Sequence, residues 1–216
     1  MEILKFNYST IVAFRTFSGL HLLNILLFFS LNIFGQNTQE NKIYSSIDAF
    51  IANPKPENLQ NLDKIINDFN ATKSLKSKDE LLAIVILTCN KAFYENQFGQ
   101  IKKAVSSYES SWRIFSEKKL NNYDIIEFCL KPLGNLYIKI GDYDNAENTI
   151  KQYYHLAFIS EQIAVTHAAI LNLSIVYQQS GRIDASTDLL ESMLKSNQLN
   201  RLEIVLYKSN LAANYL

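Results

Sequence analysis

Apolar residues recur every three or four positions along most of the chain after residue 40, which is the spacing of one face of an α-helix. The segment 81–94, LLAIVILTCNKAFY, is apolar on nearly all sides, and its length favours a buried helix over a buried strand. Elsewhere the pattern predicts helices over 41–51, 57–69, 100–117, 124–140, 143–158, 162–179, 183–195 and 199–216.

The first 36 residues show a different pattern. Lys5 and Arg15 precede an apolar run, 22–34, and the polar stretch GQNTQEN follows it, as is typical of a secretory signal peptide. The run is shorter than the about 20 residues that a membrane-spanning helix needs. We therefore expect residues 1–36 to be a signal peptide, the protein to be exported to the periplasm, cell surface or medium, and no stable membrane span to remain. An N-terminal anchor helix is the alternative.

Small residues, tyrosines and glycines recur at intervals of about forty residues. Two copies share the order small residue, tyrosine, glycine, small residue: Gly134, Tyr137, Gly141 and Ala146, then Ser174, Tyr177, Gly181 and Ser186. Ala212 and Tyr215 begin a third copy, and a weaker copy contains Ala92, Gly99 and Ala104. Small side chains let two paired helices approach closely, and glycine ends a helix at little cost in the left-handed conformation. The repeat therefore predicts stacked helix hairpins.

This order of residues resembles the tetratricopeptide repeat (TPR), and the strings around Asn172 and Asn210 resemble its long, kinesin-light-chain-like form. The standard period is about 34 residues, shorter than the spacing seen here. The resemblance implies an all-α, helical-hairpin solenoid with a right-handed superhelix over 79–216, whose last repeat lacks its second helix. Residues 37–78 would form N-terminal helices and a linker. The chain departs from the family at Pro132, inside a first helix, and at Phe158, where a proline is usual.

The same resemblance suggests where a partner would bind. In TPR proteins, Lys and Asn side chains on the first helices face a concave groove and hold an extended peptide. The matching positions are Lys131, Asn135, Asn172 and Asn210. An asparagine can both donate to and accept from a peptide backbone. The alternative is that these residues are solvated or form hydrogen bonds between repeats.

The net charge and the absence of known motifs argue against nucleic-acid binding and catalysis. The chain has 21 Lys plus Arg and 21 Asp plus Glu, so it lacks the basic surplus of a general nucleic-acid binder. It contains no phosphate-binding loop, nucleophile elbow or zinc motif, and we therefore expect no catalytic residues, cofactor or metal. His155 and His167 have no partners at ligand spacing, and Asp142 and Asp144 read as helix caps. Cys89 and Cys129 are interpreted as buried thiols of different hairpins, with a disulfide as the alternative.

Three functional hypotheses follow. The first is an exported scaffold that binds a protein or peptide through its groove and has no catalysis of its own. The second rests on the stretch 131–154, KPLGNLYIKIGDYDNAENTIKQYY, which resembles the repeat region preceding the catalytic domain of bacterial CHAT-domain proteins, a family of caspase-like proteases. The chain would then be the docking part of a larger protease, with its own downstream domain as a partner. The third, a small-molecule sensor, would need an enclosed pocket with converging polar groups.

Overall fold

The computed structural model of the protein describes residues 38–216, and residues 39–216 form one compact unit. Its helices are α2 (Gln39–Ala52), α3 (Leu59–Ala71), α4 (Lys78–Gln97), α5 (Ile101–Glu117), α6 (Lys131–Ile140), α7 (Tyr143–Ile159), α8 (Ile163–Gln179), α9 (Ile183–Lys195) and α10 (Arg201–Ala213). A 3-10 turn, η1 (Pro56–Asn58), precedes α3, and a π-helical turn, η2 (Ile126–Leu130), precedes α6. These residues contain no strand, and the all-α prediction is confirmed. The predicted signal peptide lies outside the described residues.

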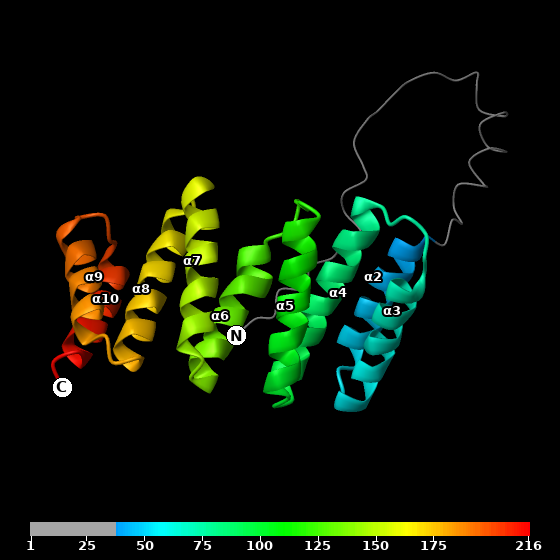
Figure 1. The fold of residues 1–216 in the computed structure, drawn as a ribbon, viewed down its shortest axis with the longest axis horizontal. Coiled ribbons are helices and arrows are strands. Elements are labelled where there is room, and N and C mark those ends of the chain that lie inside the picture. Colours follow the sequence, from blue (N-terminus) through cyan, green and yellow to red (C-terminus); the bar gives the residue numbers. More distant parts are fainter. Residues whose placement is uncertain (1–37) are drawn as a thin grey trace, which may run out of the picture. The chain divides into compact units, whose positions relative to one another are not determined.

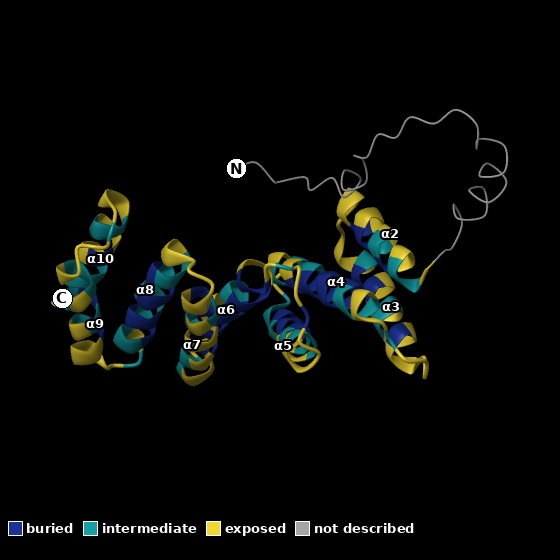
Figure 2. Ribbon diagram, turned by 90° about the horizontal axis from the view of Figure 1, so that it is seen from above, coloured by how far each residue is buried: buried dark blue, intermediate teal, exposed yellow. Residues whose placement is uncertain are grey.

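Consecutive helices lie side by side and alternate in direction (Figure 1). Seen from above, α2, α4, α6, α8 and α10 form one layer, and α3, α5, α7 and α9 form the other (Figure 2). The most extensive contacts join α4 to α5, α7 to α8, α6 to α7 and α8 to α9. Each hairpin thus buries its apolar side against its neighbours, which confirms the predicted solenoid of helix hairpins.

Local signals in the sequence fix where several helices begin. Ser77 and Glu80 form a reciprocal capping box at the start of α4, and Asn200 and Glu203 form another at the start of α10. The Asp142 carboxylate accepts a hydrogen bond from the backbone N–H of Asn145 at 3.3 Å and so caps α7. The hairpin turns after α4, α6 and α8 share one geometry, with a glycine at positive φ: 76° at Gly99, 77° at Gly141 and 79° at Gly181.

The small residues of the repeat lie at different kinds of helix contact. Gly134 on α6 faces α7 so closely that an added Cβ would lie 3.2 Å from Cγ1 of Ile150. Ala146, Ser174 and Ser186 are fully buried, and the Ser186 hydroxyl accepts a hydrogen bond from Asn214. Ala212 differs from the prediction: it is exposed, because no helix after α10 covers it within residues 38–216.

The repeat tyrosines tie each first helix to the second helix of the preceding hairpin. Their hydroxyls donate to carboxylates: Tyr137 to Glu109 on α5, Tyr177 to Glu147 on α7, and Tyr215 to Glu191 on α9. Tyr215 follows the end of α10 and is largely exposed, so its predicted place within a last helix, 199–216, is wrong. The tyrosines therefore connect successive hairpins, which the spacing alone did not reveal.

The predicted helix 124–140 is divided in two. Residues Ile126–Leu130 form the π-helical turn η2, and α6 begins at Lys131 with Pro132 in its first turn. Proline has no N–H and its ring clashes with the carbonyl one turn earlier in a continuous α-helix. The wider π turn removes this conflict and lets the first helix of this hairpin continue past Pro132.

A buried ionic cluster joins α3, α4 and α5. The Lys91 ammonium lies 2.6 Å from Oε1 of Glu95 and 3.0 Å from Oδ1 of Asp63. Ser107 on α5 donates a hydrogen bond of 2.7 Å to the second Glu95 oxygen and accepts one of 3.2 Å from Lys91. Lys91 and Glu95 sit on an otherwise apolar helix, and their burial is made tolerable by this mutual pairing.

Candidate peptide-binding face

The outer side of the layer formed by α4, η2 with α6, α8 and α10, which we call the first-helix face, combines asparagines with apolar side chains. Lys131 and Asn135 on α6 are four residues apart, which places them on one side of that helix. Phe128 lies in the π turn η2, where this spacing rule does not apply. Phe128 is 49% exposed, and its ring stacks on Tyr123 with centroids 5.6 Å apart. The Asn135 side chain is exposed.

The neighbouring first helices repeat this combination. An asparagine lies three or four residues from an apolar residue on each: Asn90 with Phe93 on α4, Asn172 with Ile175 on α8, and Leu206 with Asn210 on α10. Phe93 and Leu206 are both more than two-fifths exposed. Sequence reasoning missed Asn90, Phe93 and Phe128. Asn90 lies two residues before the small residue of its repeat, as Asn172 and Asn210 do, so its offset could have identified it.

The four residues predicted for the groove all lie on first helices, but they differ in what they contact. Asn172 donates through its amide to the hydroxyl of Tyr153 on α7 at 2.9 Å, which is the inter-repeat hydrogen bond named as the alternative. Asn210 donates to the backbone carbonyl of Leu206 at 2.9 Å. Lys131 pairs with Glu127 one turn earlier. The side-chain oxygens of both asparagines can still accept a hydrogen bond from a partner.

The Tyr153 hydroxyl on α7 holds the side-chain amide of Asn172 through this hydrogen bond. Burial raises the pKa of Tyr153, and the hydrogen bond from Asn172 lowers it by a smaller amount. Together they place the pKa of Tyr153 at about 12. The hydroxyl is therefore neutral at physiological pH. A neutral, fully buried hydroxyl is a fixed acceptor for Asn172, so this asparagine is held in one orientation on the face.

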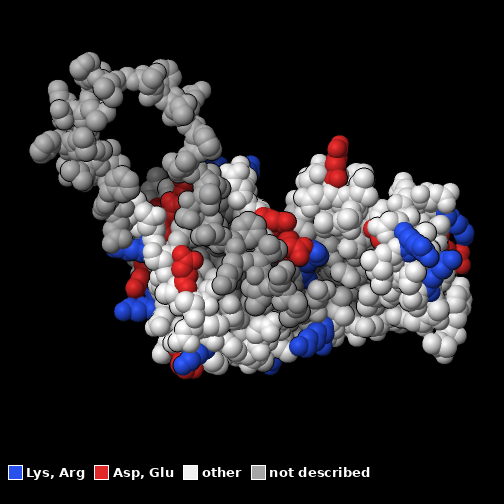
Figure 3. All heavy atoms as spheres, turned by 180° about the vertical axis from the view of Figure 1, so that it is seen from behind, with Lys and Arg blue, Asp and Glu red and all other residues white. Residues whose placement is uncertain are grey.

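Charge on the first-helix side is mixed. Viewed from behind, the parts of the surface that can be seen are mostly uncharged, with small separate groups of both signs (Figure 3). The parts that can be seen show no continuous basic stripe (Figure 3).

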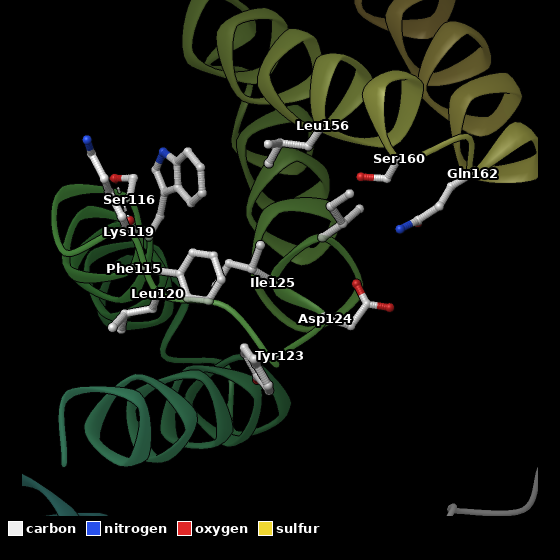
Figure 4. A pocket seen from close by; sticks show the side chains of 12 residues that line it. Phe115, Ser116, Lys119, Leu120, Tyr123, Asp124, Ile125, Leu156, Ser160 and Gln162 are labelled. Atoms are coloured by element: carbon white, nitrogen blue, oxygen red, sulfur yellow. Dashed lines mark hydrogen bonds between the residues drawn. The ribbon is translucent and has the colours of Figure 1, made fainter. Parts of the chain in front are cut away.

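A cavity of about 510 Å³ lies elsewhere, where the end of α5 and the loop after it meet η2 and the end of α7. Phe115, Leu120, Ile125 and Leu156 point into it, and Lys119, Asp124 and Gln162 lie around its edge (Figure 4). None of the four predicted groove residues lines this cavity. Its polar groups lie apart at the edge, so the converging polar lining expected of a small-molecule sensor is not formed there.

A second group of polar side chains, away from the first-helix face, connects α8 to α10. His167, almost fully buried on α8, places Nδ1 3.1 Å from Oε1 of Glu203 on α10, and its backbone carbonyl accepts from the Tyr207 hydroxyl at 2.7 Å. These contacts join α8 to α10 and were not visible in the sequence. Residues 38–216 contain no group of three side chains able to hold a metal ion. No helix in that range is long and apolar enough to cross a bilayer.

Comparison with solved structures places this arrangement among TPR-like repeats. The structure of a putative kinesin light chain from Podosopora anserina, described as having nearly identical TPR-like repeats, matches with a TM-score of 0.59 and 17% identity over 83% of this chain and 88% of that one. The structure of BtubC (BKLC) from P. vanneervenii matches with a TM-score of 0.55 and 16% identity over 82% of each chain. No protein-family model and no curated protein matches the sequence. These likenesses show the fold of the repeats.

Proposed function

We propose that this protein is an exported, non-catalytic scaffold that binds an extended segment of a partner protein across the first-helix face. The observation that supports this most is the recurrence, on α4, α8 and α10, of an asparagine three or four residues from a partly exposed apolar residue. The TPR-like fold supports a protein-interaction role in general, and the mixed charge of the face favours a peptide over a nucleic acid.

The chemistry of the face fits an extended chain. A peptide backbone offers alternating donors and acceptors, and an asparagine amide can satisfy either. Asn135 and Asn210 would pair with the peptide backbone, and Phe93 and Phe128 would receive its apolar side chains. Aromatic residues at such positions commonly dominate binding free energy because they bury a large area with few rotatable bonds.

A matched pair of phenylalanines tests this proposal. Phe128 on the first-helix face is 49% exposed and stacks on Tyr123, while Phe158 at the end of α7, in the other layer, is 62% exposed and stacks on Tyr154 with centroids 6.1 Å apart. A library of random unstructured peptides would be selected for binding to the wild-type chain. Binding of the selected peptides would then be measured by fluorescence anisotropy for Phe128→Ala and Phe158→Ala.

We expect Phe128→Ala to weaken binding about tenfold or more, the effect of losing a central aromatic contact, and Phe158→Ala to leave it unchanged. Asn135→Ala and Asn210→Ala should each weaken it without loss of helicity by circular dichroism. Equal loss in both phenylalanine variants, or loss only in Phe158→Ala, would place the binding surface elsewhere.

Export is a separate part of the proposal, based on the N-terminal pattern. Mass spectrometry of the protein from its native producer would give its N-terminus. A mature chain beginning close to Gln36 supports cleavage of the signal peptide, whereas an intact N-terminus contradicts it.

An alternative is that these repeats are the docking part of a CHAT-type protease. It rests on the sequence resemblance of 131–154, and the exposed Leu202 and Val205 on α10 are compatible with it, because a further packed helix would cover such a side. Reading the gene beyond codon 216 decides between the two. A Cys–His protease domain would support the alternative, and a stop codon there would contradict it.

A further inference from the structure

The cavity of about 510 Å³ at the end of α5 contains none of the asparagines of the first-helix face, and its lining separates apolar from polar side chains. Phe115, Leu120, Ile125 and Leu156 point into its interior (Figure 4). Trp112 also lines it, and the rings of Trp112 and Phe115 stack with centroids 6.4 Å apart. Cavities that bind small molecules typically measure about 300–1,000 Å³ and are mostly apolar, so both the size and the interior of this one suit a ligand.

The connection between α5 and η2 supplies part of this lining. It spans 118–125, whereas the connections that follow α3, α7 and α9 span 72–77, 160–162 and 196–200 and are all shorter. Leu120, Tyr123 and Ile125 of the longer connection line the cavity. The lining therefore uses residues for which the shorter connections have no counterpart.

The two charged residues at the edge of the cavity differ in their partners. One carboxylate oxygen of Asp124 accepts a hydrogen bond of 3.0 Å from the backbone N–H of Glu127, which compensates part of its charge. Lys119 is exposed, and none of the ion pairs within residues 38–216 involves it. At this edge, Lys119 is therefore the charged side chain that can pair with a ligand, and the group that it favours is an anion.

We propose that this cavity binds a small, largely apolar carboxylic acid, with its hydrocarbon body in the interior and its carboxylate at Lys119. Binding removes the apolar surface of the ligand, and that of Trp112 and Phe115, from water. A polar metabolite fits less well, because the side chains that point into the interior are apolar and would not replace its hydrogen bonds to water. This inference does not depend on the peptide-binding role.

The test uses phenylbutyrate as the acid and phenylbutanol as its uncharged analogue. Each would be titrated into the full chain at low ionic strength, and binding would be followed by calorimetry and by the fluorescence of Trp112, the one tryptophan in the sequence. Because Trp112 lines the cavity, a ligand in the interior changes its emission. We expect a saturable change with both compounds and a preference for phenylbutyrate of roughly two- to fivefold, the contribution of an exposed ion pair, which should decrease when salt is added.

A pair of neighbouring lysines tests the role of the charge. Lys119→Gln should weaken the binding of phenylbutyrate to the level of phenylbutanol and leave phenylbutanol unchanged. Lys118→Gln is the matched control, since it removes the same charge from an adjacent exposed residue that does not line the cavity, and it should change neither affinity.

A second pair tests the interior. Leu156→Glu places a carboxylate among the apolar side chains and should weaken both compounds, whereas His155→Glu, at the adjacent exposed position outside the lining, should weaken neither. Circular dichroism would show that the variants are folded, and if Leu156→Glu is not, the wild-type titrations and the lysine pair decide the matter. An unchanged Trp112 emission, equal affinities for the acid and the alcohol, equal losses in Lys118→Gln and Lys119→Gln, or full binding by folded Leu156→Glu would each overturn the proposal.

Discussion

Replacing Lys91 with methionine removes the positive charge at the centre of the buried cluster and keeps the length of the side chain. Lys91 contacts Glu95, Asp63 and Ser107 within 3.2 Å. The side chain of Glu95 is 1% exposed, so without Lys91 its carboxylate would remain in the core with Ser107 as its remaining polar contact in the cluster. Breaking one side of a buried ion pair typically costs about 3–5 kcal/mol. We expect Lys91→Met to lower the free energy of unfolding by that amount.

Two further variants show whether burial is the cause. Asp63→Asn removes the other ion pair of Lys91, but the Asp63 side chain is 52% exposed, so it should cost about 1 kcal/mol or less. The double variant Lys91→Met with Glu95→Leu removes both buried charges and should recover most of the stability that Lys91→Met alone loses. The ordering of the three variants is therefore as informative as the size of any one effect.

Urea unfolding followed by far-UV circular dichroism measures these differences, with the fluorescence of Trp112 on α5 as a probe near the affected hairpin. A cost for Lys91→Met no larger than that for Asp63→Asn would show that Glu95 is solvated or neutral once Lys91 is gone. A double variant less stable than Lys91→Met would equally refute the reasoning, since it would mean that the buried carboxylate is not what destabilises the single variant.

Three other changes test particular contacts. Gly134→Leu should lower stability by about 1–3 kcal/mol in urea unfolding, because its side chain would overlap Ile150, whereas Gly134→Ala should be close to neutral because helix propensity offsets the tight contact. Tyr153→Phe removes the hydroxyl that holds Asn172 and should cost about 1 kcal/mol in the same assay. Burial raises the pKa of the Glu147 carboxyl, but Lys151 and Arg182 lower it by more, so its pKa in the folded protein is below the unfolded value of about 4.5. The ionised carboxylate therefore stabilises the folded protein above about pH 4.5, and this contribution is lost as the pH falls through the folded pKa. The difference in Tm between wild type and Glu147→Gln should then be present at pH ~7 and fade towards pH ~3.

The helical framework could be predicted because it depends on local and periodic signals. The 3.6-residue pattern located α4 to α9, and the glycines at about forty-residue intervals marked the hairpin turns. The exception is η2, where a helical pattern continued across Pro132. A proline in the sequence predicts a steric clash within a continuous α-helix. It does not predict whether the chain avoids the clash by a kink, a new helix start or a π turn.

The candidate site was predicted less well. The sequence pointed to first helices and to four residues on them, but not to what each would contact. For Asn172 the sequence left open a groove role or a hydrogen bond between repeats, and the structure shows such a bond, from its amide to Tyr153, nineteen residues away. Phe93 lies in the stretch 81–94, which was predicted to be a buried helix, and no pattern marked Phe128. Their exposure depends on how neighbouring helices pack, which sequence periodicity does not set.

The repeat tyrosines show why partners are harder to predict than positions. Tyr137, Tyr177 and Tyr215 recur at regular spacing, but the carboxylates they bind lie 28, 30 and 24 residues earlier in the chain. Glu109 and Glu191 occupy matching places, five residues after Ala104 and Ser186, whereas Glu147 follows Ala146 directly. The glutamates therefore do not keep one register within the repeat. A repeat pattern records positions where the backbone requires a small or aromatic residue. A hydrogen bond from a tyrosine on one helix requires only a carboxylate close to its hydroxyl, and several positions on the neighbouring helix can supply one. The same freedom explains why Lys91 and Glu95, adjacent on α4, find Asp63 and Ser107 on two other helices without any periodic signal.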